Sequence, residues 1–154
     1  MSFTLTSSAF TDGSTIPNKH TRLGENIAPR LEWAGAPDET RSFALIVEDP
    51  DAPNGTFRHW GVFNIPGDRN ALPENSNMAP NGGPRFCDND FGNGRYDGPQ
   101  PPKGHGVHHY HFRLAALDVP ALSIPASAGI QAMWREARKH TIAETSLTGT
   151  FEQT

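Results

Sequence analysis

Cysteine is nearly absent from this chain, since Cys87 is the only one among 154 residues. A single cysteine excludes an internal disulfide framework and a zinc site built from several cysteines. Cys87 itself is a candidate nucleophile, although a lone cysteine in a loop is more often inert.

Basic residues and long apolar runs are also scarce. The chain has 13 Lys and Arg against 17 Asp and Glu, a formal net charge of −4, which leaves no polybasic surface for nucleic acid or anionic lipid. No apolar run approaches the roughly 20 residues that span a bilayer. Residues 1–6 lack the basic start and apolar stretch of a signal peptide. We therefore expect a cytoplasmic protein without integral membrane association.

Glycine and proline are abundant, with 15 Gly and 14 Pro. Apolar blocks alternate with these turn-forming residues, and this pattern favours many short strands joined by tight turns over disorder. A chain of 154 residues has the size of one domain. We expect a single domain over residues 1–154.

Three apolar runs are the strongest candidates for strands. Ser42–Asp49 is apolar on both parities, as in a central strand that is covered on both faces. Phe57–Ile65 and Val107–Leu117 are the other two, and Leu147–Phe151 is expected to add a last short strand. Residues 66–106 carry almost no periodicity, which inside a compact domain usually marks a functional loop.

One amphipathic helix is expected near the C-terminus. Ile130, Met133, Trp134 and Ala137 follow the i, i+3, i+4, i+7 spacing of a buried helix face, and Ser127 is the expected N-cap. Together these elements predict a mainly β protein, an antiparallel β-sandwich with one or two peripheral helices near the C-terminus.

Strand parity places three ionisable side chains on apolar faces near strand ends. Asp49 ends such a face in the first run, and His108 begins one in the third. In the second run His59 shares the more apolar face with Phe57, Gly61, Phe63 and Ile65. Each group alone is more often a hydrogen-bonded core residue or a turn former. Because an unpaired buried charge is costly, the three together predict a small polar pocket at one end of the sheet.

Two imidazoles and a carboxylate in one pocket suit a small anion. Imidazolium and loop amides give charge-assisted hydrogen bonds to phosphate or carboxylate oxygens, and a carboxylate fixes an imidazole tautomer. A Ser-His-Asp hydrolase is disfavoured, because the sequence has no Gly-x-Ser-x-Gly elbow. A metal site is the main rival, since His109 and His111 form a His-x-His on one strand face. Arg113 follows on that face, so we expect both histidines to point to solvent or to a neighbouring subunit.

Several ordered motifs around these residues are similar to those of a known family. They are Asp49–Pro53, Phe57–Trp60, Gly98–Gly104 and His108–Phe112. Through these motifs, and others along nearly the whole chain, the sequence resembles the phosphatidylethanolamine-binding protein family, which includes Raf kinase inhibitor protein. The likeness is to its bacterial and archaeal branch in particular. One departure is His109, where the family usually has arginine.

The resemblance implies a central β-sandwich with a small pocket for phosphate-like groups, including phosphorylethanolamine head groups. Carried over by motif, the ligand-binding residues would be Asp49, Asp51, His59, Gly98, Pro99, Pro101, Pro102, His108 and Tyr110. A cis Ala52–Pro53 bond is implied as well.

On this basis we expect a binding protein with no catalysis, no metal and no other cofactor, whose partner is a small anionic or phosphorylated ligand. The resemblance also suggests a homodimer. The alternatives are a modulator of a kinase or protease, as some relatives are, and a metal-dependent sandwich enzyme.

Overall fold

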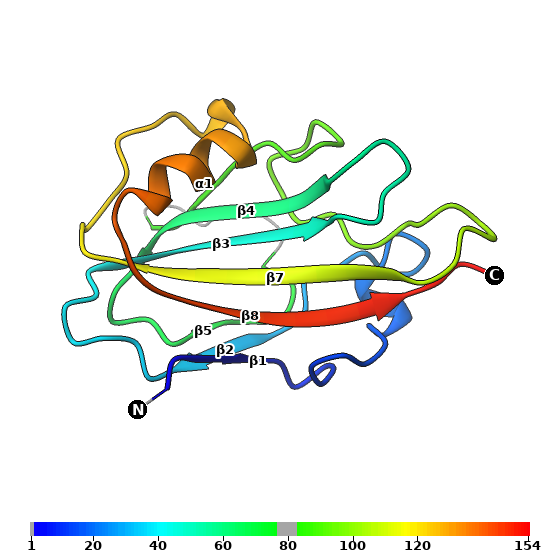
Figure 1. Cartoon of the computed structure of the whole chain (residues 1–154), viewed down its shortest axis with the longest axis horizontal. Coiled ribbons are helices and arrows are strands. Elements are labelled where there is room, and N and C mark those ends of the chain that lie inside the picture. Colours follow the sequence, from blue (N-terminus) through cyan, green and yellow to red (C-terminus); the bar gives the residue numbers. More distant parts are fainter. Residues whose placement is uncertain (1, 77–82) are drawn as a thin grey trace.

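The computed structural model describes residues 2–76 and 83–154 and shows two antiparallel sheets (Figure 1). The smaller sheet has the strand order β1-β2-β5 and the larger one β6-β4-β3-β7-β8. The strands are β1 (Thr4–Thr6), β2 (Leu31–Ala34), β3 (Ser42–Asp49), β4 (Phe57–Pro66), β5 (Ala71–Leu72), β6 (Arg85–Phe86), β7 (His108–Leu117) and β8 (Thr141–Phe151). The helices are α1 (Ile130–Arg138) and the short 3₁₀ turns η1 (Asn18–His20) and η2 (Ala126–Ala128).

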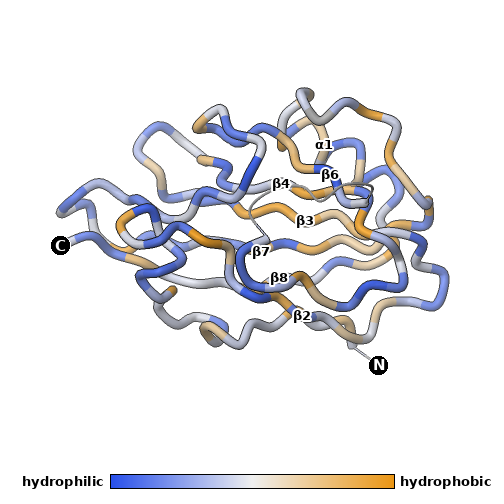
Figure 2. The backbone as a smooth tube through the Cα atoms, turned by 180° about the vertical axis from the view of Figure 1, so that it is seen from behind, coloured by the Kyte–Doolittle hydropathy of each residue, from blue (hydrophilic) through white to orange (hydrophobic). Residues whose placement is uncertain are grey.

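A hydrophobic core lies between the two sheets, which confirms the expected β-sandwich. Leu31 and Trp33 of β2 pack in one cluster with Phe43 and Leu45 of β3 and with Phe112 of β7. Figure 2 shows hydrophobic stretches along the central strands, whereas much of the surrounding loop structure is hydrophilic.

The helix α1 covers the opposite face of the larger sheet near β3 and β4. Its buried side chains are the predicted ones, Ile130, Met133, Trp134 and Ala137. They pack against a second cluster that includes Ala44 and Ile46 of β3. Apolar residues therefore cover both faces of β3, as its unbroken apolar run predicts.

The prediction that Ser127 is the N-cap of this helix is wrong. Gly129 is the N-cap, with a φ of 88°, while Ser127 lies in the preceding turn η2. The left-handed backbone at this position favours glycine, because a Cβ atom would be strained there.

Two irregularities in β4 change the faces expected from strict alternation. One lies at His59, which has no partner in β3 although both of its neighbours do. The other lies between Val62 and Ile65, where Asn64 has a φ of 59°. An extra residue in one strand reverses the alternation beyond it. Contrary to expectation, Gly61 and Phe63 face α1, and the residues facing the core between the sheets are Trp60, Val62 and Ile65.

Three further expectations need correction. Residues 66–106 include the two short strands β5 and β6, and the last strand is longer than expected because β8 pairs along the whole of β7. The described part of the chain has no cis peptide bond, so the expected cis Ala52–Pro53 bond is wrong. The chain reverses there instead at Gly55, which has a φ of 102° and donates its N–H to the Ala52 carbonyl.

Candidate functional site

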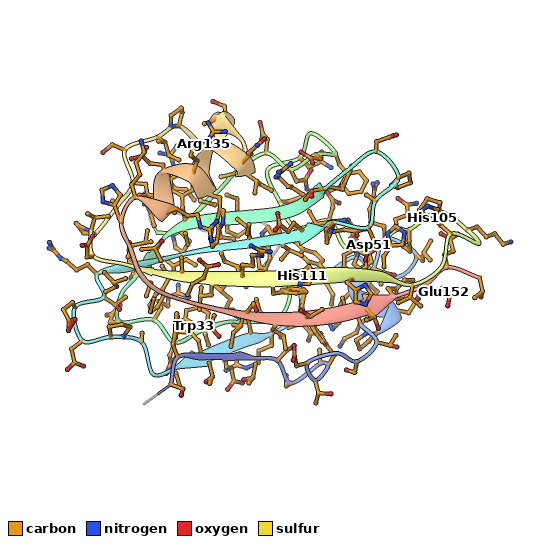
Figure 3. All side chains as sticks on the ribbon, viewed as in Figure 1. Trp33, Asp51, His105, His111, Arg135 and Glu152 are labelled. Carbon is orange, nitrogen blue, oxygen red and sulfur yellow. The ribbon has the colours of Figure 1, made fainter. Side chains whose placement is uncertain are left out.

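The end of β3 and the starts of β4 and β7 meet at one end of the larger sheet, because these strands are antiparallel neighbours. Figure 3 shows Asp51 and His105 at this end of the molecule. A pocket of about 160 Å³ opens here. Its lining residues are Asp49, Ala52, Pro53, Phe57, His59, Phe91, Gln100, Pro101, Pro102, His108 and Tyr110.

Most residues expected at the ligand site line this pocket. The structure brings together Asp49, His59, Pro101, Pro102, His108 and Tyr110. Asp51, Gly98 and Pro99 are not among the lining residues. Sequence reasoning did not single out the aromatic side chains of Phe57 and Phe91, which make part of the wall.

Asp49 and His108 form a buried pair. Their side chains lie on neighbouring strands, are 3% and 1% exposed, and are joined by a 2.6 Å contact between Oδ2 and Nδ1. The other carboxylate oxygen accepts the backbone N–H of Asp51 at 2.8 Å. Because a carboxylate is an acceptor, the proton of this contact lies on Nδ1 of His108, which fixes its ring orientation.

His105 was missed by the sequence analysis. Its Nδ1 lies 2.6 Å from Nε2 of His108, so that Asp49, His108 and His105 form a continuous chain of contacts. His105 is in a loop before β7, where strand parity gives no information.

His59 reaches the pocket from the irregular start of β4. Its Nδ1 donates to the carbonyl of Asp97 at 2.9 Å, which leaves Nε2 without a hydrogen bond among the described residues. Its ring meets the Tyr110 and Phe91 rings edge-on, with centroids 5.3 and 5.7 Å away. Burial lowers the pKa of His59. The neutral ring has an acceptor at Nε2, and the protonated ring has a donor there.

The Asp97 carboxylate anchors the loop behind His59. It is fully buried and accepts hydrogen bonds from the side-chain amides of Asn26, Asn89 and Asn93, each at 2.9 Å. Burial by itself would raise the pKa of Asp97, but these bonds and the nearby Arg95 outweigh it, and the pKa is lowered. The loop is therefore held in place by a charged group that does not itself line the pocket.

Tyr110 lines the pocket, and its hydroxyl has no hydrogen-bond partner among the described residues. The side chain is fully buried. Burial raises the pKa of Tyr110, so the hydroxyl keeps its proton and is a donor. A buried donor without a partner is costly, and such groups in native proteins usually meet water or a ligand.

Gly98 and Pro99 hold the wall loop against the N-terminal part of the chain. A Cβ atom at Gly98 would lie 2.0 Å from the carbonyl oxygen of His20, so only glycine allows this approach. The Pro99 carbonyl accepts the backbone N–H of Arg22 at 3.0 Å. These two residues position the wall and do not form its surface.

Asp51 and the two neighbouring histidines lie outside the pocket. The Asp51 carboxylate accepts both the backbone N–H and the ring Nδ1–H of His109 at 2.8 Å, and the ring contact lowers the pKa of Asp51. The Nδ1 of His111 lies 3.0 Å from the Thr148 hydroxyl. No group of three or more His, Cys, Asp or Glu side chains within residues 2–76 and 83–154 is arranged to hold a metal ion.

Cys87 is buried beneath α1 rather than in the pocket. Burial raises the pKa of its thiol to about 12. A thiol in this state is not a nucleophile at neutral pH, because the thiolate is the reactive form.

Several known proteins are similar to this chain. A protein of Aquifex aeolicus named UPF0098 protein is 38% identical over 148 residues, which cover 96% of this chain and 86% of that protein. The crystal structure of YbcL from Escherichia coli, described as a new member of the mammalian PEBP family, has a TM-score of 0.91 and 30% identity, with full coverage of both chains.

The name of a third relative is relevant to the location of this protein in the cell. The Mycobacterium tuberculosis protein named putative lipoprotein LppC is 37% identical over 154 residues, which cover 97% of this chain and 72% of that protein. In the described part of this chain no helix is long and apolar enough to cross a membrane. The cytoplasmic location stays a prediction.

The match to a family model shows the family. The model of the family described as phosphatidylethanolamine-binding protein matches residues 6–152, which is nearly the whole chain. YbcL, which is described as a member of this family, has the same fold as this chain. The chain therefore belongs to the phosphatidylethanolamine-binding protein family.

Proposed function

We propose that the pocket at the ends of β3 and β7 binds a small anionic group, such as phosphate or the phosphoryl end of phosphorylethanolamine. The observation that carries this proposal is the buried Tyr110 hydroxyl, a protonated donor without a partner on a residue that lines the pocket. The pocket is much larger than the 10–15 Å³ or so that a single water needs, so it has room for a phosphate-sized guest.

The charged groups around Tyr110 suit an anion. When His108 is protonated, its charge offsets that of Asp49, and an anion then meets no net negative charge from this pair. His59 offers Nε2 to the guest and, once protonated, adds a positive charge. A protonated phosphate oxygen can instead donate to the neutral Nε2.

The apolar wall strengthens these contacts. Phe57, Phe91, Pro53 and Pro101 keep water from part of the pocket, and hydrogen bonds to charged groups are stronger where water is excluded. The guanidinium of Arg22 lies 4.0 Å from the centroid of the Phe91 ring and adds positive charge beside this wall.

The test is calorimetric titration of the whole chain with inorganic phosphate and with O-phosphorylethanolamine. We expect measurable binding of at least one of them, and a loss of about tenfold or more in affinity for His59→Ala, as for removal of a hydrogen bond to a charged group. His111→Ala is the matched control, because His111 contacts Thr148 and does not line the pocket. Equal binding by the native chain and His59→Ala would refute the proposal.

Protein partners are a separate matter. The other expectations, a homodimer and the modulation of a kinase or protease, stay predictions. The pocket proposal depends on neither of them.

A further inference from the structure

We propose that His105 gates this pocket. Its side chain contacts Nε2 of His108, the ring nitrogen that an anionic ligand needs, and leaves this nitrogen when the ligand binds. The inference rests on the proposed anion-binding function. It concerns a residue that does not line the pocket, but whose contact with a lining residue is among the shortest in this region.

Both nitrogens of the His108 ring are engaged within the protein. Nδ1 is used by the buried carboxylate of Asp49, at 2.6 Å. Nε2 is used by Nδ1 of His105, also at 2.6 Å. An imidazole has no third hydrogen-bonding atom. While His105 stays in place, His108 therefore has no ring nitrogen free for a ligand.

The single proton between the two rings makes this exclusion stronger. Two ring nitrogens 2.6 Å apart share one hydrogen, since two N–H groups facing each other would clash. When His105 donates that hydrogen, Nε2 of His108 is an acceptor and repels the acceptor oxygens of an anion. Nε2 of His108 can donate to an anion only after His105 has moved away and the ring has taken up a proton.

The loop that carries His105 allows this movement. His105 is exposed and stands between Gly104 and Gly106, which have φ values of 76° and 94°. Figure 3 shows His105 at the outer end of the molecule, in the loop that leads into β7. The loop backbone is held independently of the ring, by bonds from the His105 N–H to the Pro102 carbonyl and from the Gly104 N–H to the Gln153 carbonyl. The side chain can therefore turn outward without breaking these backbone bonds.

His105 thus competes with the ligand inside the same protein. Such a contact reduces affinity by the free energy of the bond that must be broken, and a hydrogen bond of this kind is worth a factor of about two to ten. Its removal should therefore tighten binding, the opposite of what is expected for a residue that contacts the ligand.

The experiment is calorimetric titration with inorganic phosphate of the native chain, His105→Ala and His105→Phe. We expect both variants to bind phosphate about two- to tenfold more tightly than the native chain, since neither side chain can hydrogen-bond His108. His111→Ala again serves as the control for the loss of a histidine outside the pocket and should bind like the native chain. Unchanged or weaker binding by both His105 variants would overturn the gate.

A second measurement follows the contact directly. In ¹⁵N NMR spectra of the ligand-free chain at high pH, we expect His105 in the tautomer with the proton on Nδ1. Saturating phosphate should shift the ring ¹⁵N signals of His105 to those of a solvent-exposed histidine. A His105 signal that phosphate does not change would contradict the proposal. If the native chain binds phosphate but neither His105 variant binds more tightly, the gate fails and the anion pocket stands. If neither the native chain nor any variant binds phosphate or O-phosphorylethanolamine, the proposed function fails and the gate with it.

Discussion

The two tyrosines of this chain differ in the hydrogen bonding of their hydroxyl groups. Tyr96 and Tyr110 are both fully buried. The Tyr96 hydroxyl donates to the His20 carbonyl at 2.7 Å, and Tyr96 is not among the residues that line the pocket. Tyr110 does line the pocket, and its buried hydroxyl has no partner among the described residues. The Tyr96 hydroxyl therefore has a structural hydrogen bond, and the proposed function gives the Tyr110 hydroxyl a role in ligand binding.

The two conservative substitutions should separate these roles. Tyr110→Phe removes an unpartnered buried hydroxyl, so we expect the ligand-free protein to be as stable as the native chain or more stable by up to about 1 kcal/mol. Its affinity for phosphate should fall several-fold. Tyr96→Phe removes an existing hydrogen bond and should lower the free energy of unfolding by about 1 kcal/mol. Its phosphate affinity should be unchanged. Urea denaturation and calorimetry measure both quantities, and a fall in affinity for Tyr96→Phe alone would contradict this assignment.

At the scale of elements, the packing of α1 on the sheet depends on a missing side chain in β4. A Cβ atom at Gly61 would lie 2.6 Å from Cγ1 of Ile130 and 3.3 Å from Cβ of Cys87. Gly61 faces the helix because the irregularity at His59 changes the alternation of β4. The same irregularity thus turns His59 toward the pocket and Gly61 toward the helix.

Gly61→Ala should therefore destabilise the protein. The added methyl group forces α1 to shift from the sheet, and overpacking of this kind costs about 1–3 kcal/mol in the free energy of unfolding. Phosphate affinity should change little, since α1 lies on the face opposite the core between the sheets. Gly94→Ala is a suitable control, because its nearest neighbour would be the flexible side chain of Asp88 at 3.3 Å. A Gly61→Ala protein as stable as Gly94→Ala, measured by urea denaturation, would show that the helix adapts freely.

For the whole molecule, two buried histidines link stability to pH. Burial lowers the pKa of both His59 and His20 in the folded chain, while an unfolded histidine titrates near 6.5. Below about pH 6.5 the unfolded chain thus binds more protons than the folded one, and stability falls as pH falls. Above this pH the contribution of both residues is fully present.

We expect the free energy of unfolding to decrease between about pH 6.5 and pH 5, by at most ~1.4 kcal/mol per pH unit for each of the two histidines. Urea denaturation in phosphate-free buffers measures it. Phosphate added at a fixed pH should raise the stability again, because a ligand that binds only the folded state stabilises it. A free energy of unfolding that stays constant or rises over this range would contradict the assignment of His59 and His20 as buried neutral residues.

The sequence by itself determined the main strands, the helix and the family. The runs of β3 and β7 and the helix spacing of Ile130 to Ala137 were readable, because burial of an apolar face imposes a period of 2 or 3.6 on the residues. The same periodicity led to Asp49 and His108, since both continue a buried strand face. These are local regularities, and a single chain segment carries each of them.

Only the tertiary structure decided which groups meet at the pocket and how they bond. The irregularities in β4 follow from its pairing with β3 and leave no periodic signal in the sequence. The sequence therefore could not show that Gly61 and Phe63 lie on one face of the sheet and Ile65 on the other. The contact of His105 with His108 and the carbonyl bond to His59 come from loops. Loop residues follow no periodic pattern. Their partners depend on which distant segments come together in the fold, and composition and residue spacing do not reveal this.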